Sequence, residues 1–271
     1  MRNGIYALLL AAGCSASTPT ATTAPLRDDA SSTSPAAVQA ALRAAVDGPA
    51  RTEEDRARDI YRHPAETLAF FGVAPGMDVI ELAPGGGWYT RILAPLLRGN
   101  GTLAVALPDG RYGDMFRQLQ SDDPALYGDV RVARLQPPDG IELGEPESAD
   151  VVLTFRNTHG WAEAGAERAV YDAVFRVLRP GGTFGVVQHR DAEGAELDAA
   201  SGYLPEAYVI RVAEQAGFEL VDRSEINANP RDTRDHEHGV WSLPPVLRGG
   251  DVDRERFLAI GESDRMTLRF R

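Results

Sequence analysis

The stretch Asp78–Thr90, which reads DVIELAPGGGWYT, decides the fold. It opens with the apolar run of a buried strand, passes through Gly85, Gly86 and Gly87, and continues in a pattern typical of a helix. Glycine tolerates a positive φ and lets the backbone approach a ligand closely. The helix that follows presents free N–H groups and the positive end of its dipole. Strand, turn and helix together predict a cradle for a nucleotide-like ligand that carries a carboxylate or a phosphate.

Strand and helix patterns alternate along the rest of the chain, as in a parallel sheet with crossover helices. Helices are expected upstream over 38–63 and 64–72. The expected strands are 77–83, 102–107, 130–135, 149–155, 183–188, 218–224 and 266–270. The main intervening helices are expected over 88–97, 115–120, 163–178 and 206–216. We therefore predict an α/β, Rossmann-like fold with a mostly parallel, seven-stranded sheet and helices on both faces.

A glycine-rich turn of this kind allows three interpretations. A phosphate-binding P-loop requires a Lys after its glycines, and the chain contains no Lys, which excludes it. A dinucleotide loop follows G-x-G-x-x-G/A, whereas here Thr90 stands where the third small residue belongs. A tight structural turn without a ligand is the third reading of the glycine triplet.

Further segments of the same sheet resemble the class I, S-adenosylmethionine-dependent methyltransferases. Leu178-Arg-Pro-Gly-Gly182 and Ala216-Gly217-Phe218 are similar to signatures of that family, and the resemblance covers about residues 64–270. More narrowly, RHPAETLAFFG, ELAPGGGWYT, TFRNTHGW and INANPRD resemble a group of bacterial predicted methyltransferases, some of them exported. The resemblance implies a class I methyltransferase fold and S-adenosylmethionine as cofactor. It implies cofactor contacts from Glu81, Ala83, Gly85, Gly86 and Gly87.

The sequence departs from the family pattern at two positions. Ala83 stands where the family has the first glycine, and the strand over 102–107 does not end in the acidic residue that binds the ribose hydroxyls. Asp109, two residues late, is the candidate for that contact, and Asp139 is the candidate for the adenine amino group, against a solvated loop carboxylate. Loss of the ribose contact would weaken cofactor binding, because a carboxylate contributes strong hydrogen bonds.

Candidate catalytic residues follow the strands over 149–155 and 183–188, since ligands of open α/β sheets bind at the carboxyl ends of the strands. Phe155 is assigned a cofactor contact and Asn157 a hold on a substrate heteroatom. His159 is a candidate general base, because histidine titrates near neutrality, and His189 lies on the same rim. For each histidine alone, a hydrogen-bonded structural role is the competing interpretation.

Two further polar segments could serve a binding site. The run Tyr61–His63 precedes the core and is read either as a cover for the pocket or as a helix end. His236 and His238 lie near two aspartates, Asp232 and Asp235, but no further ligand stands at a set spacing, so we expect no metal site.

The N-terminus predicts export. Arg2, a short apolar run and small residues precede Cys14, the chain's single cysteine, in the layout of a lipoprotein signal. We expect residues 1–13 to be a signal peptide, 14–37 a disordered tether rich in Ser, Thr, Ala and Pro, and 38–271 the methyltransferase-like domain. Lipid attached to Cys14 would anchor the protein to a membrane facing the periplasm. Ser15 in place of Asp favours the outer membrane, and a cytoplasmic protein with a buried apolar N-terminus is the alternative.

The charge balance limits the partners. The formal net charge of −12 argues against nonspecific nucleic-acid binding. The leading expectation is methyl transfer from S-adenosylmethionine to a small molecule. The alternatives are a catalytically inactive nucleoside-binding module on the same fold and, third, a dinucleotide-dependent oxidoreductase. The sequence leaves the oligomeric state open.

Overall fold

The computed structural model describes residue 1 and residues 34–271. The predicted signal peptide from residue 2 onward, Cys14 and all but the last four residues of the predicted tether lie outside the described residues. In the part that is described, none of the helices has the length and apolar character needed to cross a membrane.

The sheet has eight strands in the order β4-β3-β2-β1-β5-β6-β8-β7. Their bounds are β1 Asp78–Leu82, β2 Thr102–Leu107, β3 Arg131–Gln136, β4 Gly140–Glu142, β5 Ala149–Phe155, β6 Leu178–His189, β7 Leu220–Ser224 and β8 Arg265–Phe270. Strands β3, β2, β1, β5 and β6 run parallel, whereas β4 and β8 are antiparallel to their neighbours. The predicted fold is confirmed, but seven strands was one too few, because the short edge strand β4 carries no alternating pattern of its own.

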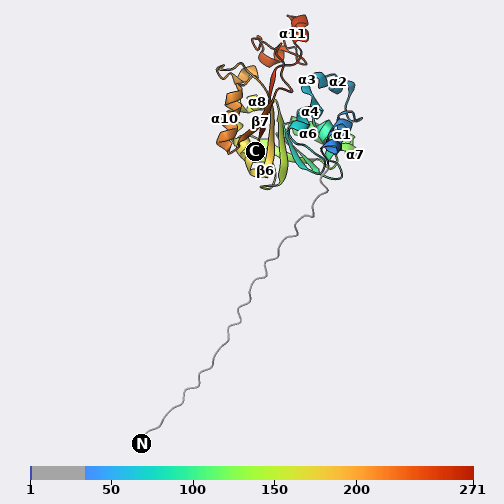
Figure 1. The fold of residues 1–271 in the computed structure, drawn as a ribbon, viewed down its shortest axis with the longest axis vertical. Coiled ribbons are helices and arrows are strands. Elements are labelled where there is room, and N and C mark those ends of the chain that lie inside the picture. Colours follow the sequence, from blue (N-terminus) through green and yellow to red (C-terminus); the bar gives the residue numbers. More distant parts are fainter. Residues whose placement is uncertain (2–33) are drawn as a thin grey trace. The chain divides into compact units, whose positions relative to one another are not determined.

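Helices cover both faces of the sheet, with α8 and α10 on one side and α1, α4, α6 and α7 on the other (Figure 1). Their bounds are α1 Pro35–Val46, α2 Glu53–Arg56, α3 Asp59–Arg62, α4 Pro64–Phe70, α5 Thr90–Leu97, α6 Arg111–Asp122, α7 Pro124–Tyr127, α8 Thr158–Glu163, α9 Glu167–Val177, α10 Glu206–Ala216 and α11 Arg254–Ile260. Two 3-10 turns, η1 Ala199–Ser201 and η2 Gly239–Ser242, lie in the C-terminal third. The strand order turns back between β1 and β5, which is where open α/β sheets bind ligands.

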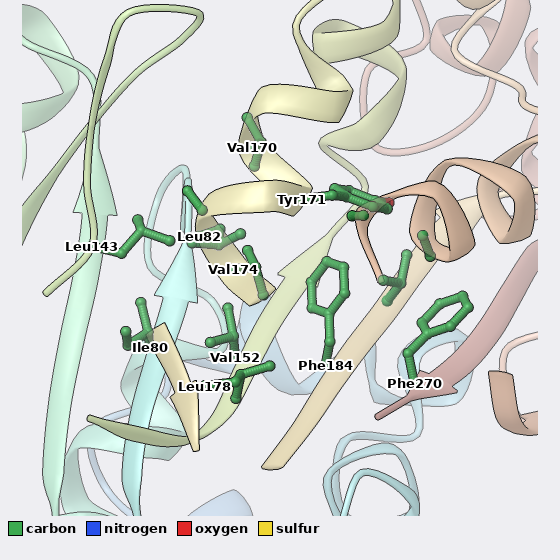
Figure 2. Close-up of a cluster of buried hydrophobic side chains, with 14 of the residues drawn as sticks. Ile80, Leu82, Leu143, Val152, Val170, Tyr171, Val174, Leu178, Phe184 and Phe270 are labelled. Atoms are coloured by element: carbon green, nitrogen blue, oxygen red, sulfur yellow. The ribbon is translucent and has the colours of Figure 1, made fainter. Parts of the chain in front are cut away.

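An apolar core fills the space between the sheet and helix α9. Tyr171 and Val174 of α9 point toward Phe184 of β6 and Val152 of β5 (Figure 2). The rings of Tyr171 and Phe184 meet edge to face, with centroids 4.9 Å apart. These contacts pack α9 against β5 and β6, and the site is built on the carboxyl ends of these two strands.

The single helix expected over 38–63 is wrong, because three short helices occupy this part of the chain. Gly48 and Pro49 interrupt it, and Thr52 then begins α2 with a capping box formed with Asp55. Arg51 fills the break by donating to the carbonyls of Val46 and Asp55. The break turns α2 and α3 over the carboxyl edge of the sheet.

Gly185 in β6 is required by close packing. A Cβ at this position would lie 2.7 Å from Cγ of Phe71 and 2.8 Å from Cδ2 of Leu153. We expect Gly185→Ala to lower the free energy of unfolding by about 1–3 kcal/mol, as overpacking of a core does, measured by urea denaturation. Gly160→Ala is the control, because a Cβ there meets no described atom within 4 Å. Equal stability of the two variants would contradict this packing.

Candidate functional site

The glycine loop forms an open cradle at the end of β1. Ala83, Gly85 and Gly87 have φ values of 45°, 60° and 78°. Ala83 thus adopts the left-handed conformation, in which glycine is favoured, at the position where the family pattern has glycine. A Cβ on Gly85 or Gly86 would meet no described atom within 4 Å. The loop therefore faces open space and is not filled by its own side chains.

A cavity of about 530 Å³ lies against this loop. The structure brings together in its lining these predicted site residues: Glu81, Ala83, Gly85, Gly86, Phe155, Asn157, His159 and His189. They come from the carboxyl ends of β1, β5 and β6, from the loops that follow β1 and β5, and, for His159, from helix α8. The structure thus places these predicted residues together at one edge of the sheet, and the role of each residue stays a prediction.

Glu81 is a buried carboxyl group on the cavity wall, 1% exposed. Thr90 Oγ1 donates to its Oε2 at 2.6 Å. Burial raises the pKa of Glu81 to about 7, and the hydrogen bond from Thr90 and the charge of Arg91 oppose this shift. The carboxyl group can therefore ionise near neutral pH when a cation enters the cavity.

Asn157 ties two strands together at the cavity. Its Nδ2 donates to the carbonyl of Leu82 at 3.0 Å and to Thr154 Oγ1 at 3.2 Å. The amide group thereby fixes the end of β5 against the end of β1. Phe155 lies stacked on Tyr89, with ring centroids 3.6 Å apart, and forms an apolar wall.

The two histidines share one rim, as predicted, with ring centroids 5.7 Å apart. Gln188 Nε2 faces His159 Nδ1 at 3.3 Å, so that nitrogen accepts and Nε2 carries the proton of the neutral ring. His189 Nδ1 lies 2.5 Å from Ser263 Oγ. Burial lowers the pKa of His159 and, more strongly, that of His189. Both rings are therefore neutral near pH 7.

Three sequence-predicted residues lie outside the cavity lining. Gly87 lies in the turn that precedes α5 and has a positive φ. Asp139 is exposed between β3 and β4. Asp109 is exposed, and its Oδ2 accepts from Arg134 Nε at 3.0 Å. The neighbouring strand thus holds the carboxylate that the sequence assigned to the ribose.

Charged residues that the sequence analysis did not assign also line the cavity: Asp55, Arg58, Arg91 and Arg156. In the segment Tyr61–His63, which the sequence suggested as a cover for the pocket or a helix end, Arg62 alone lines the cavity. Trp241 of η2 closes one side, with its ring 5.7 Å from that of His159. No local pattern distinguishes these positions, because they reach the site only through long-range packing.

The segment with His236 forms a hydrogen-bond network. Asp232 accepts from the Tyr203 hydroxyl and from the backbone N–H of Asp264, and its Oδ1 lies 2.8 Å from His236 Nε2. Across residues 34–271 no cluster of three or more potential metal ligands is found.

No protein-family model matches the chain, and no curated protein sequence does either. Solved structures do match its fold. The [4+2]-cyclase SpnF aligns with a TM-score of 0.56 at 14% identity, covering 83% of this chain and 84% of that one. A methyltransferase of Aquifex aeolicus, described as S-adenosylmethionine-dependent, aligns with a TM-score of 0.53 at 17% identity, covering 70% and 93%. Another so described, from Mesorhizobium loti, gives 0.50 at 14% identity, covering 83% and 99%.

These likenesses show that the chain has the Rossmann-like fold of class I methyltransferases. Because a cyclase shares the fold with methyltransferases, the fold alone does not define the reaction. The chemistry of the site must decide the function.

Proposed function

We propose that this protein binds S-adenosylmethionine at the glycine loop and transfers its methyl group to a small-molecule acceptor. The observation that carries the proposal is the open cradle beside Gly85 and Gly86, with the ionisable Glu81 on the same wall. Backbone groups there can approach the amino-acid part of the cofactor closely. The Glu81 carboxylate is suited to the cofactor's ammonium group.

In this proposal the neutral histidines interact with the methyl acceptor. S-adenosylmethionine provides an activated methyl group, so the protein's task is to align the acceptor and, where required, to take its proton. With its Nδ1 accepting from Gln188, the neutral His159 ring presents Nε2–H, which can hold an acceptor heteroatom, and it takes the acceptor's proton only through a shift of the ring to the other tautomer. His159 is better placed than His189 for this role, because His189 is buried and bonded to Ser263.

In this proposal the adenosine part of S-adenosylmethionine has fewer polar partners in the protein than the amino-acid part. Asp109 is held by Arg134 at the exposed end of β2. We therefore expect affinity to depend mainly on the glycine loop and Glu81.

A blocked cradle tests the proposal. Gly86 has no positive φ and a Cβ there meets no described atom within 4 Å, so the fold accommodates Gly86→Leu, which adds bulk at the cavity lining. We expect calorimetry of the full chain to give a Kd for S-adenosylhomocysteine of about 1–100 μM, within the range of enzyme ligands. Gly86→Leu should weaken it at least about tenfold, or about 1.4 kcal/mol.

Gly160→Leu is the matched control, since Gly160 also has room for a Cβ but lies outside the cavity lining. If the wild-type chain bound neither S-adenosylmethionine nor S-adenosylhomocysteine, the proposal would be refuted. Binding of NADP instead would favour an oxidoreductase. Tight S-adenosylhomocysteine binding without methyl transfer to a broad set of acceptors would favour the inactive binding module.

A further inference from the structure

Several arginines line the cavity in addition to the residues of the glycine loop. Arg62 and Arg156 lie there beside His159 and His189. The charge of Arg156 lowers the pKa of His159 and that of Glu163 raises it, whereas the charge of Arg91 lowers the pKa of Glu81.

Arg62 has unused hydrogen-bond donors although it is only 2% exposed. Its Nε donates to Glu262 Oε2 at 3.2 Å, but within residues 34–271 neither Nη1 nor Nη2 has a partner. The guanidinium lies over the ring of Trp88, 4.7 Å from its centroid. Leaving such donors unpaired in the interior is costly, and Arg62 is one of the residues that line the cavity.

Within the described part of the chain the Arg156 guanidinium makes no hydrogen bond and no ion pair, although the charge of Glu262 acts on it. It is half-buried on the cavity wall and has φ of 66°, in the left-handed region that non-glycine residues avoid. Burial, together with the charges of Arg62 and Arg265, lowers its pKa well below the usual value. Strain and an unpaired charge at one residue are typical of a functional position.

The surrounding charges do not balance. Arg58, Arg62 and Arg265 all contact the single carboxylate of Glu262. With Arg156 the cluster has four guanidinium groups around one acid. Burial lowers the pKa of Arg62 to about 10, and the charge of Glu262 opposes this. A second anion would complete the cluster.

We propose that Arg62 and Arg156 form a site on the cavity wall that binds an oxyanion group, a carboxylate or a phosphate, carried by the methyl acceptor. The guanidinium fork matches both groups, because each offers paired oxygens to two N–H donors. Arg62 and Arg156 would hold the oxyanion and place the rest of the acceptor beside His159. This inference rests on the proposed function in assigning the anion to the acceptor, but the oxyanion site itself does not depend on the cofactor.

Two simple probes test the site. Benzoate and inorganic phosphate are titrated into the full chain at low ionic strength, and tryptophan fluorescence is recorded, because Trp88 contacts Arg62 and Trp241 contacts His159. We expect saturable binding of at least one probe, and the tighter of the two identifies carboxylate or phosphate as the acceptor's group. Absence of saturable binding of both probes would overturn the proposal.

Substitution of Arg156 separates a binding role from a structural one. Arg156→Gln should weaken the probe at least about tenfold, and it should raise the melting temperature because it removes an unpaired charge from the cavity wall. Arg117→Gln is the matched control: Arg117 is exposed on α6, paired with Asp114, and should change neither quantity. Equal probe binding by wild type and Arg156→Gln would contradict the proposal.

A competition experiment assigns the anion. If the oxyanion belongs to the acceptor, saturating S-adenosylhomocysteine leaves the probe's affinity unchanged. If S-adenosylhomocysteine excludes the probe, the arginines hold the cofactor's own carboxylate and the acceptor assignment is overturned. Probe binding by a chain that does not bind S-adenosylhomocysteine would refute the proposed function and leave the oxyanion site standing.

Discussion

Replacing Glu81 by Gln is expected to weaken S-adenosylhomocysteine binding about 10–100-fold at pH 7.5 while making the protein more stable. Gln retains an oxygen for Thr90 Oγ1, so the packing at the cradle is preserved. It cannot offer a negative charge to the ligand's ammonium group, and a charged hydrogen bond of this kind contributes about 1.5–3 kcal/mol. Calorimetry of the two proteins measures the difference.

The pH dependence follows from the raised pKa of Glu81. Its value rises from 4.5 in the unfolded chain to about 7 in the fold, so the folded state binds the proton more tightly. This carboxyl group therefore costs nothing below pH 4.5, and its ionisation destabilises the fold increasingly until about pH 7. The full penalty is on the order of 3 kcal/mol, from 1.36 kcal/mol per pH unit.

The affinity for the cofactor should rise over the pH range in which the ionisation of Glu81 lowers the stability of the fold. The ionised carboxylate is the form that attracts the ammonium group, so wild-type affinity should increase from pH 5.5 to 7.5. Glu81→Gln should flatten that increase and should be more stable than wild type at pH 8 but not at pH 4.5. Glu142→Gln, with its carboxylate 75% exposed, is the control for both measurements. An unchanged affinity profile in Glu81→Gln would show that Glu81 does not contact the ligand.

The parts of the site that the sequence predicts are local. β1, the glycine turn and α5 follow one another within a short stretch, so the hydrophobic run and the glycines define them directly. The sequence also predicts that Phe155, Asn157 and His159 lie near the glycine loop, because β5 and β1 are parallel and end at the same edge of the sheet. These positions required no knowledge of long-range packing.

The parts that the sequence misses depend on partners far along the chain. The orientation of Asp109 is decided by Arg134 on the next strand. Arg62 reaches the cavity because the chain breaks at Gly48 and Pro49 and turns α2 and α3 over the sheet. The unpaired state of Arg156 is invisible in a sequence, since it depends on which acids the fold brings near. The lipid anchor at Cys14 stays a prediction.

Glu262→Gln should produce the largest loss of stability, about 3–5 kcal/mol, as removal of one partner from a buried ion pair does. Glu262 is 2% exposed and receives Arg58, Arg62 and Arg265. Burial acts to raise its pKa, but the arginines outweigh burial and hold the pKa well below the usual value. Because the folded pKa is depressed, the carboxylate stabilises the fold above the unfolded pKa of 4.5, and the loss should be complete at pH 7.

Urea denaturation at pH 7 measures this loss, with Asp222→Asn as the control, since Asp222 pairs with Arg269 at an exposed site and should change stability by less than about 1 kcal/mol. The same variant connects the stability of the cluster to the oxyanion site. Without Glu262, three guanidinium groups lose their shared anion, so phosphate or benzoate should stabilise Glu262→Gln more than wild type. If Glu262→Gln kept wild-type stability, the arginines would not depend on a nearby anion. The excess of positive charge would then no longer favour an anionic acceptor.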